Sequence, residues 1–180
     1  MKRTILIVLL LLMISCDKKQ EGEKVALKNK TVVFFDPLSL GASGVDANLK
    51  ITAYFSECGE WGGHHEDLKI FSKEGNYKDQ FLNYRKTNID CDNRDSKGRN
   101  IETVVVQKTI KLTEPNKKSL IAYMKRMIES KVQERFPGHA GDQFSILNAD
   151  STFVIEVYDK DSNNVRSYNQ LLTELRLHKK

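Results

Sequence analysis

The sequence predicts an α+β fold in which an antiparallel sheet has two helices packed on one face. Most of this 180-residue chain after residue 30 alternates apolar and polar residues with a period of two, which is typical of strands with one buried face. Two later stretches instead repeat their apolar residues with a period of 3.6, which is typical of amphipathic helices. The resulting order of strands, helix, hairpin and helix favours an antiparallel sheet.

The predicted sheet includes a hairpin over residues 48–72. Apolar and polar residues alternate from Leu49 to Phe55, and the alternation resumes at Leu68 after the glycine pair at 62–63, which is typical of a turn. Further strands are expected at 31–36, 80–85, 101–113, 144–146 and 153–157. In the longest of these, the apolar residues share one parity in the sequence. They are Val104, Val106, Ile110 and Leu112. We therefore expect those four side chains on one face of the sheet.

The first helix is predicted over residues 116–135. Thr113 suits its N-cap, and Pro115 suits its first turn because a proline has no N–H to leave unpaired there. The Pro-Gly pair at 137–138 predicts its end. Its apolar stripe consists of Leu120, Met124, Met127, Ile128, Val132 and Phe136.

The second helix is predicted to start near Ser167. Gln170 lies three residues later, which is the spacing of a capping box. The apolar residues of this helix are Tyr168, Leu171, Leu172 and Leu175.

The N-terminus has the pattern of an export signal. A short basic start, Met1-Lys2-Arg3-Thr4, precedes an uncharged apolar run of ten residues from Ile5 to Ile14. Ten helical residues rise about 15 Å, which is half of the roughly 30 Å hydrocarbon thickness of a membrane. The run is therefore too short for a permanent span and favours a signal-peptide core.

The residues that follow this core, Met13-Ile14-Ser15-Cys16, resemble the lipobox of bacterial lipoproteins, in the looser form familiar from Bacteroidota. The commonest lipobox has leucine where this chain has Met13. The resemblance covers about the first 20 residues, and it implies cleavage before Cys16 and lipidation of that cysteine. Two or three acyl chains, palmitate among them, would give a stable membrane anchor.

This resemblance implies a division of the chain into three parts. Residues 1–15 would be the signal peptide, residues 16–30 the lipidated cysteine with a flexible tether, and residues 31–180 a single globular domain. The stretch after Cys16 is charged and almost free of apolar residues, so it cannot bury enough surface to fold. The expected location is the cell envelope, at the periplasmic or surface face of the inner or outer membrane.

Cys58 and Cys91 remain once Cys16 carries lipid. In an oxidising compartment an even pair favours a disulfide. Such a bridge would close a loop of about 33 residues and contribute roughly 3 to 4 kcal/mol on the chain-entropy model. A free thiol pair and a pair of thiolate ligands are the alternatives.

The densest polar cluster in the chain lies at residues 57–67. His64, His65 and Glu66 carry the donor groups that suit Zn²⁺, so a metal site is one hypothesis for this cluster. The spacing argues against it, because adjacent residues on a strand point to opposite faces. The alternative is a disulfide-linked hairpin tip with exposed histidines, where Trp61 is either a core residue or an exposed contact.

The charge and the motifs favour a binding protein. Cleavage before Cys16 would remove two of the 29 basic residues and none of the 24 acidic ones, which lowers the net charge from +5 to +3. Export and this near balance exclude nucleic acid as the natural partner. We therefore expect a non-enzymatic envelope module without a cofactor, which binds the membrane through its lipid and an envelope or secreted protein through Trp61. The alternative is a zinc-binding protein or metal-dependent hydrolase that uses His64, His65 and Glu66.

Overall fold

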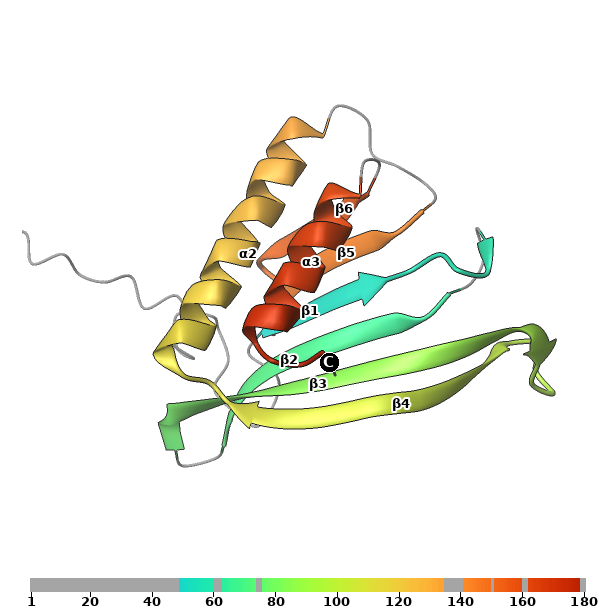
Figure 1. Ribbon diagram of the computed structural model, residues 1–180, viewed down its shortest axis with the longest axis horizontal. Coiled ribbons are helices and arrows are strands. Elements are labelled where there is room, and N and C mark those ends of the chain that lie inside the picture. The colour runs from blue at the N-terminus through green and yellow to red at the C-terminus, as the bar shows by residue number, and fades with distance from the viewer. Residues whose placement is uncertain are drawn as a thin grey trace, which may run out of the picture. The chain divides into compact units, whose positions relative to one another are not determined.

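Figure 1 shows the computed structural model of the protein. The structure describes residues 49–59, 63–73, 76–134, 141–149, 151–159 and 162–178, all of which belong to one compact unit. The signal segment, the tether, the expected strand at 31–36 and the residues Cys16 and Trp61 lie outside the described residues.

The described residues form one six-stranded antiparallel sheet with the spatial order β4-β3-β2-β1-β5-β6. The predicted hairpin is confirmed, because β1 and β2 pair antiparallel with Ile51 opposite Leu68. β1 also pairs with β5, a strand that begins almost a hundred residues later, so it lies in the interior of the sheet. The strands are β1 (Leu49–Tyr54), β2 (His65–Lys73), β3 (Asn76–Arg94), β4 (Asn100–Lys111), β5 (Gln143–Asn148) and β6 (Val154–Tyr158).

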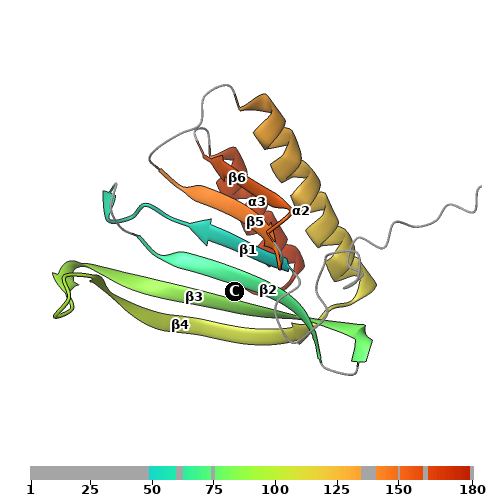
Figure 2. The ribbon, with the colours of Figure 1, turned by 180° about the vertical axis from the view of Figure 1, so that it is seen from behind.

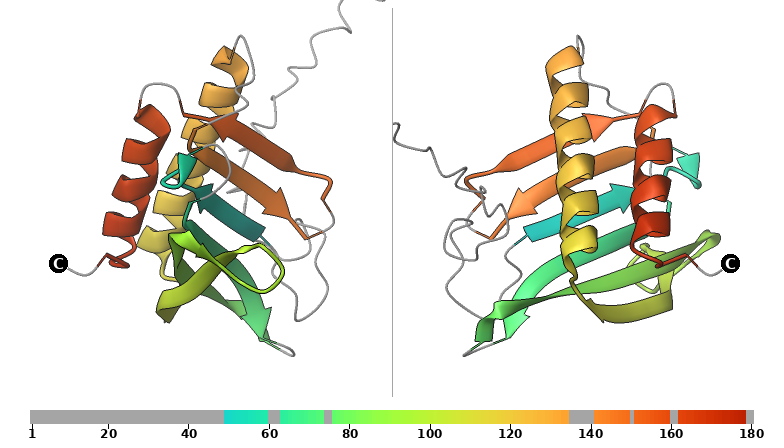
Figure 3. Two further views of the ribbon diagram at one scale, coloured as in Figure 1. Left: turned by 90° about the vertical axis from the view of Figure 1, so that its right-hand side faces the viewer. Right: turned by 60° about the vertical axis from the view of Figure 1, so that its left-hand side comes forward.

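Two helices, α2 (Glu114–Gln133) and α3 (Asn163–Glu174), lie side by side on one face of this sheet. The right-hand view of Figure 3 shows both in front of the strands, and Figure 2 shows the sheet from the other side. This arrangement confirms the predicted α+β class, with an antiparallel sheet and two helices on one face.

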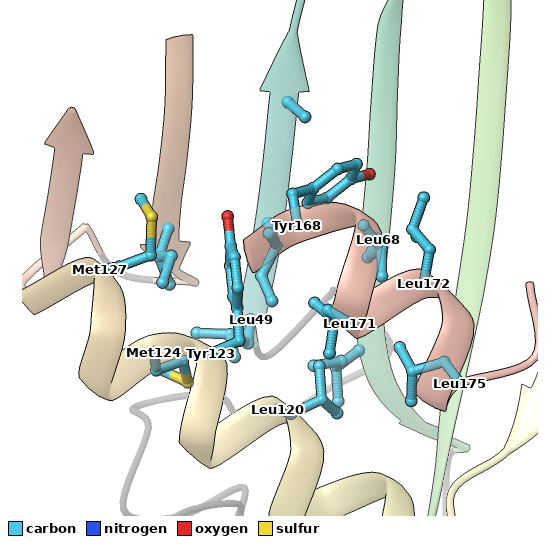
Figure 4. Packing of buried hydrophobic residues seen from close by; sticks show 14 of the residues in the cluster. Leu49, Leu68, Leu120, Tyr123, Met124, Met127, Tyr168, Leu171, Leu172 and Leu175 are labelled. Atoms are coloured by element: carbon cyan, nitrogen blue, oxygen red, sulfur yellow. The ribbon is translucent and has the colours of Figure 1, made fainter. Parts of the chain in front are cut away.

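The hydrophobic core fills the space between the helices and the sheet (Figure 4). It buries every second residue of β1, namely Leu49, Ile51 and Ala53, as the alternation predicted. Its largest fully buried side chains are Tyr123 from α2 and Tyr168 from α3. The other helix residues that point into this core in Figure 4 are Leu120, Met124, Met127, Leu171, Leu172 and Leu175.

The structure confirms the predicted start of α2 and corrects its apolar stripe. Thr113 is the N-cap, and its hydroxyl and backbone form a capping box with Asn116. However, Ile128 is 40 % exposed and Val132 is 80 % exposed, so they do not belong to the core. The right-hand view of Figure 3 shows the last turns of α2 extending past the strands, which leaves them less covered. The helix ends at Gln133, and the expected Pro-Gly stop lies outside the described residues.

Two further expectations were wrong in detail. α3 begins at Asn163 with Ser162 as its N-cap position, so Ser167 lies inside the helix and is not its cap. In β4, the register with β3 shifts between the pairs Lys86↔Val106 and Thr87↔Val104. This β-bulge inserts Val105 and therefore places Val104 on the face opposite Val106, although both have the same parity in the sequence.

Neither helix in the described part of the chain combines the length and apolar character that crossing a membrane requires.

Candidate functional site

The most prominent surface feature is a two-stranded arm that β3 and β4 form beyond the rest of the sheet. β2 pairs with β3 only as far as Glu66↔Lys86, whereas the pairing of β3 with β4 continues to Arg94↔Asn100. Figure 1 shows the green and yellow strands running past the ends of β1 and β2. We call residues 87–105 the arm.

The turn at the tip of the arm is held by hydrogen bonds around Asp95. The backbone N–H of Asp95 donates to the carbonyl of Arg99 at 2.7 Å, and Gly98 adopts a φ of +76°, which glycine allows without steric cost. The Arg99 guanidinium donates twice to the Asp95 carboxylate, at 2.9 and 3.0 Å. The hydrogen bond from the Arg99 backbone, together with this guanidinium, lowers the pKa of Asp95. The tip is therefore an ordered turn.

A disulfide between Cys58 and Cys91 ties the arm to the segment that follows β1, with the two Cα atoms 5.3 Å apart. The predicted pairing is therefore present in the structure. Cys91 lies on β3 within the arm, and Cys58 follows β1 and precedes Trp61 by three residues in the sequence. The covalent bond thus holds the segment after β1 beside the arm.

Between the arm and the facing ends of β1 and β2 lies a hollow of about 330 Å³ on the helix-free face. A second hollow of about 390 Å³ adjoins it at the tip and shares Arg99, Asn100 and Glu102. We call the first one the arm hollow. It is lined by Tyr54, Gly63, His65, Ile89, Arg94, Arg99, Asn100 and Glu102.

The arm hollow contains polar groups that the fold leaves unused. The Asn100 side-chain oxygen is buried and has no hydrogen-bond partner among the described residues. The Arg94 guanidinium donates to the Gly98 carbonyl at 3.0 Å, and no carboxylate among the described residues pairs with it. Burial raises the pKa of Tyr54, so its phenol stays protonated and remains a hydrogen-bond donor.

On the opposite, helix-covered face of the same corner, Glu66 is buried at 2 % exposure within a polar network. The Tyr84 hydroxyl donates to its Oε2 at 2.8 Å and the Tyr168 hydroxyl at 3.2 Å. The Lys86 ammonium donates to its Oε1 at 2.8 Å, and His64 Nε2 lies 3.3 Å from the same oxygen. The carboxylate therefore has partners on both oxygens.

These contacts set the ionisation of the network. Burial by itself would raise the pKa of Glu66, but the hydrogen bonds from Lys86 and Tyr84 outweigh it and hold that pKa below its ordinary value. Burial and the neighbouring carboxylate raise the pKa of Tyr84 and of Tyr168 far above the ordinary range. Glu66 is therefore ionised and both phenols are neutral at physiological pH.

His64 lies at the edge of this network. Its Nδ1 is 2.7 Å from Glu57 Oε2, and its ring stacks on Phe55 with centroids 4.5 Å apart. Both ring nitrogens thus face carboxylate oxygens, one from Glu57 and one from Glu66. The contacts join the loop after β1 to the buried network.

The structure does not bring the three predicted zinc ligands together. His64 and Glu66 lie on the helix-covered face, whereas His65 lies on the other face with its Nδ1 3.3 Å from the Thr87 hydroxyl. The two oxygens of Glu66 are already occupied by internal donors. In the described residues, no group of three His, Cys, Asp or Glu side chains could hold a metal ion.

Several residues of the two polar sites had no individual signal in the sequence. Tyr84, Lys86 and Tyr168 reach Glu66 from other strands and from α3, so only the tertiary fold unites them. One signal for Glu66 itself was present, because it shares the parity of the core residues Leu68 and Ile70.

No protein-family model matches this chain, and no curated protein is significantly similar to it in sequence.

Proposed function

We propose that this protein is a lipid-anchored module of the cell envelope that binds another envelope or secreted protein through its arm. The observation on which this rests is the arm itself, which projects beyond the sheet and is tied by a disulfide to the loop after β1.

The arm offers the apolar surface that protein contacts use. Ile101, Val104 and Val105 are 42 %, 43 % and 51 % exposed, although large apolar side chains are more often buried. They lie on β4, which is an edge strand of the described sheet. Edge strands with exposed apolar residues are typical sites for pairing with another chain. Trp61, which would supply an aromatic anchor, follows Cys58 by three residues in the sequence.

The lipid anchor is supported by the N-terminal sequence and by the cysteine chemistry. The apolar run that ends at Ser15-Cys16 resembles a lipobox, and Cys16 is the one cysteine outside the disulfide. A disulfide in a small domain is typical of oxidising compartments, which supports export. The tether of about 14 residues has a reach on the order of 20 Å as a flexible coil, so the arm would act near a membrane surface.

The anchor is tested by metabolic labelling with palmitate in a bacterial host, followed by membrane fractionation. We expect the label and the membrane association to be lost in Cys16→Ser. The matched control is the double variant Cys58→Ser/Cys91→Ser, which keeps Cys16 and should keep the label. Labelling of Cys16→Ser, or its retention in membranes without cleavage, would overturn the anchor.

The contact surface is tested by site-specific photo-crosslinking in intact cells. A photoreactive amino acid at Val105 on the arm should give a discrete adduct with one envelope or secreted protein. The control position is Val132 on α2, which is apolar and 80 % exposed but lies away from the arm. Equal adducts from both positions, or none from Val105, would contradict the assignment of the arm as the contact surface.

A further inference from the structure

We propose that the arm hollow binds a ligand that carries a carboxylate next to an N–H group, as a free amino acid or the C-terminal residue of a peptide does. This inference deepens the proposed binding function, because residues of the same arm line the hollow. It rests on the side chains that line the hollow and on what each of them can accept or donate.

The carboxylate would bind Arg94. Its guanidinium donates one hydrogen bond, to the Gly98 carbonyl, and has no carboxylate partner among the described residues. A guanidinium has five N–H donors, so several remain for an incoming anion. Arg99, by contrast, donates two hydrogen bonds to the Asp95 carboxylate. Its charge is therefore already paired where it lines the hollow. The Tyr54 hydroxyl is a second donor on the lining.

The N–H group would bind the Glu102 carboxylate, which lies on the same lining as Arg94. The hollow thus combines an unpaired cation with a carboxylate acceptor, which matches a ligand of both kinds better than a simple anion.

His65 also lines the hollow. Its backbone N–H donates to the Thr87 hydroxyl at 3.1 Å, and that hydroxyl lies 3.0 Å from the His65 carbonyl and 3.3 Å from its Nδ1. Thr87 therefore fixes the position of His65 beside the hollow.

The size and the frame of the hollow suit a ligand of this kind. About 330 Å³ lies at the lower end of small-molecule sites and holds one amino-acid residue with its water. The disulfide ties the arm to the segment after β1, and the Asp95 turn holds Arg99 in place, so less entropy is lost when a ligand binds.

The test is a titration of the ¹⁵N-labelled full chain in detergent micelles, followed by NMR. The probes are N-acetyl-alanyl-alanine, the same dipeptide with a C-terminal amide, and free alanine. We expect saturable chemical-shift changes at arm residues with N-acetyl-alanyl-alanine, with free alanine, or with both. The dipeptide amide should bind at least tenfold more weakly. Preference for the dipeptide would assign a peptide C-terminus, and preference for alanine a free amino acid. Equal binding of the amide, or no shift up to about 10 mM of either carboxylate, would overturn the proposal.

Two variants locate the binding. Arg94→Gln should weaken binding at least tenfold, whereas Lys97→Gln, which removes the same charge at the tip outside the hollow, should not. Glu102→Gln should weaken binding without loss of thermal stability, because Glu102 is exposed on β4. Unchanged affinity in both Arg94→Gln and Glu102→Gln would contradict the site. A protein that still crosslinks at Val105 but fails this titration would refute the hollow alone.

Discussion

The buried carboxylate of Glu66 gives the sharpest prediction, because its environment fixes both the sign and the size of the effect. Glu66→Gln conserves the shape of the side chain but removes the charge that faces the Lys86 ammonium. One of the two terminal atoms becomes an NH₂ group, which cannot accept a hydrogen bond. Either the lysine or the two tyrosines Tyr84 and Tyr168 must then lose an acceptor.

The magnitude follows from the exposure of the partners. Removing one partner of a fully buried ion pair costs about 3–5 kcal/mol. The Lys86 side chain is 35 % exposed, so part of its charge returns to water once the pair is broken. We therefore expect the free energy of unfolding to fall by about 2–3 kcal/mol.

The assay is urea unfolding of the oxidised full chain in micelles, with Glu102→Gln as the control. Glu102 is exposed on β4, so its substitution should change the free energy of unfolding by less than about 0.5 kcal/mol. A loss below about 1 kcal/mol for Glu66→Gln, or an equal loss in the control, would refute the reasoning.

The pH dependence gives a second readout of the same residue. The folded pKa of Glu66 is lowered from 4.5, so the folded protein binds fewer protons than the unfolded chain in the range below that value. The stabilisation is therefore present above about pH 5 and is lost as the pH falls through the folded pKa. Glu66→Gln should flatten the stability profile in this acid range, and an unchanged slope would contradict the assigned ionisation.

Three other predictions can be measured on the same protein. Reduction of the disulfide, or Cys91→Ser, should lower the free energy of unfolding by about 3 kcal/mol; equal urea midpoints with and without reductant would contradict this. Met127→Ala in the core should cost about 2–5 kcal/mol, whereas Val132→Ala on the same helix should cost less than about 0.5 kcal/mol. Elemental analysis should find far less than one zinc per chain, because His64 and His65 lie on opposite faces; stoichiometric zinc that His64→Ala removes would restore the metal hypothesis.

The fold was largely predictable because its signals are local. Alternation from Leu49 onwards and the capping residues around Thr113 each need only a short window of sequence. The errors arose where a single residue changes the geometry. The extra residue Val105 places the Val104 side chain on the opposite face of the sheet from Val106. No residue type in the sequence marks such a bulge in advance. The exposure of Val132 depends on where the sheet ends, which the helix sequence does not contain.

The candidate sites were less predictable, because their residues meet only in the folded chain. Glu66 and Tyr168 are 102 residues apart in the sequence. The arm hollow combines residues from β1, β2, β3 and β4, and its cations are separated in the sequence from Tyr54 by some forty residues. The cysteine pair was the exception, because only two cysteines remain once Cys16 is assigned elsewhere.

The interior position of β1 determines when the chain can fold. β1 is among the earliest segments of the described chain to be synthesised, yet Leu49 pairs with Asn148, and the helix that covers this region ends at Glu174. Until those late segments leave the ribosome, only α2 is available to cover the apolar face of β1 to β4. The native layers therefore assemble only after nearly the whole chain is available, because long-range pairing must wait for its partner.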